Sequence, residues 1–219
     1  MFNTCIKDTF RFFFTHWWVL AVIVVPLNLM GELVRGVLAP TSVDAAQVGN
    51  FGIYFVVVML VSIAASIATI QYIHATVQSS RLSVTQTWLL AANNFPGYLV
   101  LSLLSVLAVV AGLVAFIVPG IVVLVRISLA PYVFLLEKRS AKESIKHSWE
   151  LTRGHFGTLF LGTIVLAIPG ILFSFLITSS SDLTASNVQV AIISSIEMWL
   201  GVLFTVFYFR VYTYLNSQR

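Results

Sequence analysis

The segment KRSAKESIKHSWELTR, residues 138–153, decides the fold class of this chain. Wound as an α-helix at about 100° per residue, it gathers apolar and small side chains on one stripe: Ile145, Ser148, Trp149 and Thr152. The opposite side gathers the charged side chains: Lys142, Glu143, Lys146, Glu150 and Arg153. This pattern predicts a helix that lies on a membrane surface. A long apolar segment follows it directly, so the chain is expected to be a membrane protein.

This predicted surface helix carries its own start and stop signals. Ser140 followed by Glu143 is a capping-box start, and Gly154 is a typical stop. The residues expected at the membrane surface are Lys138, Arg139, Lys142, Lys146, Trp149 and Arg153. Their charge favours an anionic leaflet by about 1 kcal/mol per effective charge. The alternative, that they only keep this loop in the cytoplasm, stays open.

Composition extends the membrane assignment to the whole chain. Hydrophobic residues make up 59% and charged residues 9% of the sequence, against about 45–50% and about 25% in soluble domains. A bilayer core of about 30 Å needs roughly 20 apolar residues in a helix. Six segments qualify, near 16–37, 51–76, 96–118, 120–136, 156–178 and 188–213. We therefore expect an all-α polytopic membrane protein in which residues 1–219 form one membrane domain.

The third and fourth spans are separated only by Pro119 and Gly120. Proline breaks the helical hydrogen-bond ladder and glycine permits a sharp reversal. One continuous helix through both segments would be about 60 Å long, which far exceeds the bilayer. A tight hairpin turn at Pro119-Gly120 is therefore expected.

Basic residues predict the orientation of the spans, because Lys and Arg in short loops stay in the cytoplasm. The expected outer loops, 37–50 and 179–187, contain Asp44 and Asp182 but no Lys or Arg. With both termini inside, most basic residues fall on the cytoplasmic side: Lys7, Arg11, Arg81, Lys138, Arg139, Lys142, Lys146, Arg153, Arg210 and Arg219. The net charge of +4 is thereby explained by topology, and a nucleic-acid partner is not expected.

Three repeated units are expected, near 4–77, 82–137 and 140–214, each with an interfacial helix followed by a transmembrane hairpin. In this register equivalent positions carry similar residues: Thr9, Thr87 and Ser148 in the first helix, and His16, Asn94 and His155 just before the first span. A polar residue recurs in each second span: Gln71, Arg126 and Arg210. The alternative is convergence, since any surface helix needs an aromatic anchor and a polar hinge.

Arg126 and Glu197 are charges placed within apolar segments. A charge near the bilayer centre costs about 2.5–3.5 kcal/mol, so such groups usually face a partner or a wet cavity. Counted from the outer ends of their spans, the two lie at similar depth and could pair. Such a pair is either a structural staple or a site where Arg126 contacts lipid phosphate. The candidate ligand-binding residues are Arg126, Glu197, Arg210 and Gln71.

The sequence contains no recognisable catalytic pattern. An HExxH motif, a Ser-His dyad and clustered carboxylates on facing helices are all missing from it. Its four histidines are too scattered for a metal set. An enzyme, a metal and a cofactor are therefore not expected.

The run IVPGIVVLVRISLAPYVFLLEKRSAKESIKHSWELTRG and the C-terminal YFRVYTYL resemble the YciC-like family of bacterial inner-membrane proteins. They are also similar to the membrane domain attached to some glycerophosphodiester phosphodiesterases. The shared features are Pro119-Gly120, then Leu129-Ala130-Pro131, then a charged turn. The resemblance implies a role in envelope maintenance. Arg126 stands where the family pattern is generally apolar. No catalytic phosphodiesterase domain is present, so phosphodiesterase activity is not expected of this chain.

These observations favour a non-enzymatic protein of the bacterial inner membrane, with a role in envelope or lipid homeostasis. Its expected partners are membrane lipids, among them anionic phospholipid, and a further membrane protein is a candidate partner. The alternative is a small transporter, or a transporter subunit, with an intramembrane site at Arg126 and Glu197. Internal repeats and broken spans occur in such proteins.

Overall fold

The computed structural model describes residues 2–38, 47–80, 83–180 and 187–218. Asp44 and Asp182 of the two expected outer loops, the basic residues Arg81 and Arg219, and the side chain of Arg35 lie outside the described part. Every regular element in these ranges is an α-helix: α1 (Phe2–Leu38), α2 (Gln47–Val77), α3 (Val84–Ala115), α4 (Ile117–Ile127), α5 (Ala130–Glu137), α6 (Ala141–Leu151), α7 (Phe156–Ser180) and α8 (Asn187–Asn216).

The helices confirm the expectation of six candidate membrane spans. Six helical segments are long and apolar enough to cross a bilayer: Phe2–Val34, Gly52–Val77, Val84–Ala115, Ile117–Glu137, Phe156–Ile177 and Val188–Asn216. Large apolar side chains on them are exposed, such as Val114 at 81% and Phe175 at 68%. In water such a surface would be an interaction site, and in a bilayer it faces lipid.

The junctions between the expected surface helices and spans differ from one another. In α1 the backbone leaves helical geometry at His16, with φ −114° and ψ 16°, so a kink separates two helical parts. In α3 the helix runs without a break past Asn94, whose side-chain Nδ2 donates to the Leu90 carbonyl at 2.8 Å. Only at His155 do two separate helices meet, because α6 ends at Leu151 and α7 begins at Phe156.

The hairpin between the third and fourth spans is confirmed, but its turn is not where the sequence predicted it. The chain reverses at Phe116, which is extended with φ −170° and ψ 159°. Pro119 and Gly120 lie inside the first turn of α4, where proline is tolerated because the amide it lacks is not needed. Gly120 instead permits close contact between α3 and α4. A Cβ added to Gly112 of α3 would lie 2.9 Å from the Cα of Gly120.

The fourth span is also interrupted. Helix α4 ends at Ile127 and α5 begins at Ala130, with Ser128 and Leu129 between them. Ser128 Oγ donates to the Val125 carbonyl at 2.8 Å, which satisfies one of the carbonyls freed at the end of α4. Pro131 occupies the first turn of α5, so the expected single span 120–136 is two short helices in series.

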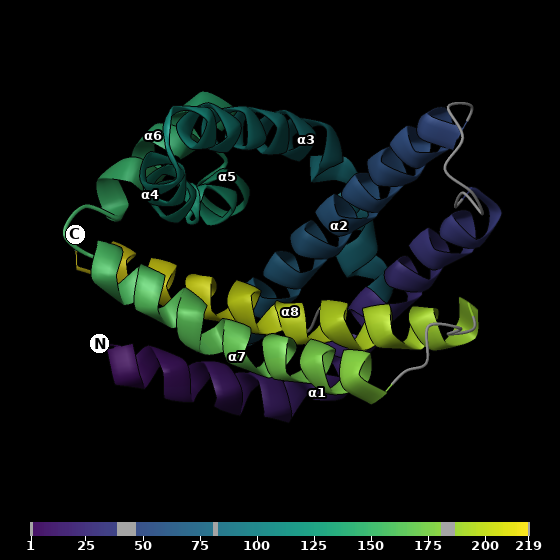
Figure 1. Cartoon of the computed structure of the whole chain (residues 1–219). Helices are drawn as coiled ribbons and strands as arrows, with labels where there is room; N and C mark the ends of the chain where they lie inside the picture. The colour runs from purple at the N-terminus through teal and green to yellow at the C-terminus, as the bar shows by residue number, and fades with distance from the viewer. Residues whose placement is uncertain (1, 39–46, 81–82, 181–186, 219) are drawn as a thin grey trace.

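One buried cluster joins the helices, and it draws on residues from Cys5 to Leu215. Helix α1 packs against both α2 and α8, and α7 packs against α8. Figure 1 shows α7 and α8 side by side, with α3 to α6 gathered at one end and both chain termini on the same side of the molecule.

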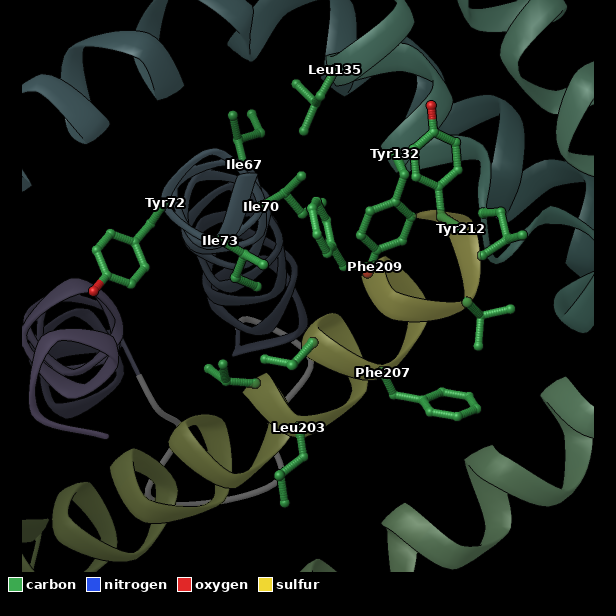
Figure 2. Packing of buried hydrophobic residues seen from close by; sticks show 14 of the residues in the cluster. Ile67, Ile70, Tyr72, Ile73, Tyr132, Leu135, Leu203, Phe207, Phe209 and Tyr212 are labelled. Atoms are coloured by element: carbon green, nitrogen blue, oxygen red, sulfur yellow. The ribbon is translucent and has the colours of Figure 1, made fainter. Parts of the chain in front are cut away.

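The centre of this cluster lies where α2, α5 and α8 meet. Figure 2 shows isoleucines of α2 and aromatic side chains of α5 and α8 filling this space. The Tyr132 ring lies 6.3 Å from that of Phe209 and 6.0 Å from that of Tyr212. The Tyr132 hydroxyl donates to the Thr205 carbonyl at 2.9 Å. A buried tyrosine thus finds an acceptor for its polar end.

Candidate functional site

Helix α6 forms over the predicted segment, but its small-residue stripe packs on protein. Ser148 and Thr152 are fully buried, and α6 packs against α3, α4 and α5. Trp149, by contrast, is 43% exposed. The stripe predicted to enter the membrane surface is therefore largely used for helix packing, because hydroxyl groups at Ser148 and Thr152 find acceptors on α4.

The charged side of α6 is exposed as expected. All six residues predicted at the membrane surface are exposed: Lys138, Arg139, Lys142, Lys146, Trp149 and Arg153. Lys138 also ends α5, because it adopts a left-handed conformation with φ 54°. Helix α6 ends at Leu151 with Thr152 as its C-cap, and the predicted stop residue Gly154 lies in the turn that follows, with φ 83°. The positive side chains thus form one accessible face next to the membrane spans.

The predicted capping box at the start of α6 is confirmed. Ser140 Oγ accepts from the Glu143 amide, and a Glu143 carboxylate oxygen accepts from the Ser140 amide at 3.1 Å and from its hydroxyl at 2.7 Å. These hydrogen bonds hold the pKa of Glu143 below its usual value of 4.5. Because the pKa is lower in the folded state, the stabilisation is complete above pH 4.5 and is lost as the pH falls through the lowered pKa.

We expect Ser140→Ala to destabilise the first turn of α6 by about 1 kcal/mol, since it removes the acceptor of the Glu143 amide. Amide hydrogen exchange of residues 141–144 would be faster than in the wild type at neutral pH. The difference would shrink below pH 4.5 as Glu143 becomes protonated. Lys142→Ala, in the same turn but outside the box, is the control. Equal exchange rates in Ser140→Ala and the wild type would contradict this role.

A cluster of polar side chains around Glu137 joins α5, α6 and α8. Its carboxylate receives Arg139 Nε at 2.6 Å and the Tyr212 hydroxyl at 2.9 Å. His147 Nε2 lies 3.6 Å from the same carboxylate. Arg139 is therefore both exposed at the surface and held by Glu137. The sequence pattern did not predict this cluster, although an acidic residue at the end of a span beside basic residues was a visible signal.

Arg126 lies at the C-terminal end of α4, beneath α6. Its carbonyl oxygen accepts from Ser148 Oγ at 2.8 Å and from Thr152 Oγ1 at 3.3 Å. Its guanidinium lies 5.8 Å from the centre of the Trp149 ring, a cation–π contact. The Nε and Nη1 atoms are buried and have no hydrogen-bond partner. A buried guanidinium that lacks an acceptor is costly unless a ligand or water supplies one.

Arg210 repeats this arrangement on α8. Its guanidinium lies 5.9 Å from the centre of the Phe12 ring of α1, and its Nε is buried without a hydrogen-bond partner. Arg210 also lines a cavity of about 290 Å³ between the N-terminal part of α1 and the C-terminal end of α8. Polar side chains on both helices line it, among them Thr4, Asp8, Thr213 and Ser217.

The structure does not join the four candidate ligand-binding residues into one site. The hypothesised ion pair between Arg126 and Glu197 is not formed. Glu197 is exposed on α8 and accepts a hydrogen bond from Ser174 of α7. Gln71 lies half-buried in α2. Counting residues from span ends failed because α4 is a short helix that ends beneath α6 instead of crossing the full span.

A second feature that the sequence did not reveal is a small cavity among the spans. It measures about 230 Å³ and is lined by α1, α2 and α8. Four hydroxyl side chains line it: Ser62, Ser66, Thr69 and Thr205. Ser66 Oγ also lies 2.8 Å from the Tyr98 hydroxyl of α3. The small residues of the second span that predicted close packing thus also leave a polar space.

Within the described ranges, no group of three His, Cys, Asp or Glu side chains is placed to hold a metal ion. Cys5 is a buried free cysteine beside the Arg210 cavity. The described residues offer guanidinium donors, hydroxyl groups and an exposed basic face.

Comparison with known proteins places the chain among bacterial membrane proteins. A UPF0259 membrane protein of Serratia proteamaculans (strain 568) is 26% identical over 140 residues, which cover 64% of this chain and 56% of the relative. The UPF0259 membrane protein of Yersinia pestis (strain Pestoides F) is 27% identical over 139 residues, or 64% of this chain and 54% of the relative. The chain spans just over half the length of these relatives.

No solved structure matches the chain. The profile of a family described as "Uncharacterised protein family (UPF0259)" matches residues 56–214. This range contains α3 to α7 and most of α2 and α8. Because the match covers well over half of the sequence, the chain belongs to the UPF0259 family of membrane proteins.

Proposed function

We propose that this protein is a non-enzymatic component of the bacterial inner membrane that binds anionic phospholipid at the cytoplasmic leaflet. Both termini are cytoplasmic in this proposal, and the bound lipid serves envelope or lipid homeostasis. The observation that carries it is the half-buried Arg126 side chain, whose Nε and Nη1 atoms are buried without a hydrogen-bond acceptor. A lipid phosphate supplies such an acceptor, and arginine binds phosphate through two parallel N–H groups.

The surroundings of Arg126 support a lipid ligand. Trp149 is partly exposed and covers the guanidinium, and tryptophan is enriched at the level of lipid headgroups. Lys142, Lys146 and Arg153 are exposed on the same helix as Trp149 or directly after it. Such basic clusters attract anionic headgroups. The role in envelope maintenance rests on the resemblance of residues 117–160 to YciC-like proteins.

The three-unit repeat belongs to the same proposal. The equivalent residues Thr9, Thr87 and Ser148 are all fully buried. Arg126 of the second unit lies against Trp149 of the third, and Arg210 of the third unit lies against Phe12 of the first. In each case the polar residue of a second span meets the interfacial helix of a neighbouring unit. Convergence alone does not predict this shared pattern of contacts.

The transporter alternative has less support. Arg126 and Glu197 do not pair, and neither lines the hydroxyl-rich cavity among the spans. That cavity of about 230 Å³ favours a small polar solute or bound water.

The test is native mass spectrometry of the purified protein with an equimolar mixture of phosphatidylglycerol and phosphatidylcholine. The wild type is expected to retain phosphatidylglycerol preferentially. Arg126→Gln should weaken this retention about tenfold or more, because a charge-assisted hydrogen bond contributes about 1.5–3 kcal/mol. Arg126→Lys should keep part of it, since lysine retains the charge but not the bidentate geometry.

Arg153→Gln is the matched control, because it removes an exposed arginine near the same helix end. If Arg153→Gln weakened retention as much as Arg126→Gln, the effect would be one of general charge and not of a site. Equal retention of the two lipids by the wild type would overturn the proposal, and recovery of a protein partner without lipid would favour a scaffold function.

A further inference from the structure

The cavity at Arg210 holds one cationic and one anionic side chain that do not pair with each other. Arg210 of α8 and Asp8 of α1 both line it and are both half-buried. Among the described residues neither takes part in an ion pair, and Arg210 Nε has no hydrogen-bond partner. Two opposite charges that share a cavity without contact leave room for a ligand between them.

The hydroxyl groups of the cavity are arranged to accept hydrogen bonds. Thr213 Oγ1 donates its proton to the Arg210 carbonyl at 3.0 Å, and Ser217 Oγ donates to the Tyr214 carbonyl at 2.8 Å. Each hydroxyl oxygen therefore keeps its lone pairs for a further donor. Together with the Asp8 carboxylate, they offer several acceptors to a group that carries several N–H bonds.

A ligand that matches these groups has a phosphate at one end and a primary ammonium at the other. The phosphate would accept from Arg210, and the three N–H donors of the ammonium would reach Asp8, Thr213 and Ser217. A headgroup with net negative charge would be repelled by the Asp8 carboxylate. A quaternary ammonium has no N–H to donate and is usually bound by several aromatic faces, whereas among the described residues that line this cavity only Tyr214 is aromatic.

The position of the cavity fits a lipid headgroup. It lies where the N-terminal part of α1 meets the end of α8, on the side of the molecule that carries both chain termini (Figure 1). Its volume of about 290 Å³ is close to the lower end of the range for ligand pockets, about 300–1,000 Å³. From the geometry and the charges we infer that the cavity binds the zwitterionic headgroup of an aminophospholipid, phosphate on Arg210 and ammonium on Asp8.

This site is separate from the one at Arg126 and prefers a different lipid, so either proposal can fail alone. The experiment is native mass spectrometry of the full chain with equimolar phosphatidylethanolamine, phosphatidylcholine and phosphatidylglycerol. At this site the wild type is expected to retain phosphatidylethanolamine about tenfold better than phosphatidylcholine. This comparison needs no variant. If the wild type retained phosphatidylcholine as well as phosphatidylethanolamine, the inference would be wrong.

Two variants then assign the two ends of the headgroup. Asp8→Asn should abolish the preference for phosphatidylethanolamine over phosphatidylcholine and leave phosphate binding intact. Arg210→Gln should lower retention of both lipids. Lys7→Gln is the matched control, because Lys7 is exposed, adjoins Asp8 and does not line the cavity. If Lys7→Gln changed the preference as much as Asp8→Asn, long-range charge and not the cavity would be responsible.

A soluble competitor distinguishes a lipid from a small metabolite with the same chemistry. Phosphoethanolamine is added to the protein that carries phosphatidylethanolamine. If millimolar phosphoethanolamine displaced the lipid, the cavity would recognise the headgroup alone. If the lipid stayed bound, the cavity would require the intact lipid. If phosphoethanolamine displaces the lipid from the wild type, it is expected not to do so in Asp8→Asn. Equal displacement by inorganic phosphate would contradict a role for the ammonium.

Discussion

Gly120→Ala is expected to destabilise the protein by about 1–3 kcal/mol, as overpacking of a tight contact does. A Cβ at this position would lie 2.4 Å from Leu113 Cδ2 and 2.9 Å from the Leu113 backbone nitrogen. The leucine side chain can rotate, but the backbone of α3 cannot yield without separating the two helices. The measurement is the thermal unfolding temperature of the purified protein in one detergent, which should fall.

Gly157→Ala is the control for this prediction. A Cβ on Gly157 meets nothing within 4 Å, and alanine is favoured over glycine in a helix by roughly 0.5–1 kcal/mol. The two substitutions make the same chemical change and should shift stability in opposite directions. An unchanged unfolding temperature in Gly120→Ala would mean that α3 and α4 are not in close backbone contact.

Glu137→Gln is the second substitution with a large expected effect. The carboxylate is an acceptor for both Arg139 and Tyr212, so neutralising it weakens contacts that hold α5 to α8 and to the start of α6. A hydrogen bond to a charged group contributes about 1.5–3 kcal/mol. We expect a loss of stability in that range, again measured as the unfolding temperature.

Tyr212→Phe isolates one arm of this cluster. It removes the hydroxyl that donates to Glu137 at 2.9 Å and leaves the ring in place beside Tyr132. In a double-mutant cycle, Glu137→Gln and Tyr212→Phe should couple by about 0.5 kcal/mol or more. Strictly additive effects would show that Glu137 stabilises the fold through Arg139 or His147 instead.

Much of the fold could be predicted because its signals are local. Apolar segments long enough to span a bilayer predicted six spans, and the six candidate helices lie over them. The capping box at Ser140 and Glu143 and the stop at Gly154 depend on neighbours within four residues, and the structure has both. Helix ends of this kind can be predicted because their hydrogen bonds form between residues that are close together in the sequence.

The candidate site could be predicted only in part, since its residues were visible but their partners were not. Arg126 and Arg210 stood out as charges in apolar segments, and both are half-buried side chains with at least one buried guanidinium nitrogen that has no hydrogen-bond partner. The expected partner of Arg126 was Glu197, yet the residues that surround it are Ser148, Trp149 and Thr152. Depth counted along the sequence does not tell which helix a side chain faces, and Arg126 faces Trp149 of α6.

The sequence by itself determined the class of this protein, the number of its candidate spans and the caps of α6. These follow from hydrophobicity and from hydrogen bonds between residues close in the chain. Only the tertiary structure decided which face of α6 packs on protein, where the α3–α4 hairpin turns, and which residues meet at Arg126, Glu137 and Arg210. Those features depend on side chains brought together from distant helices, and an amphipathic stripe has the same sequence pattern whether it packs on lipid or on another helix.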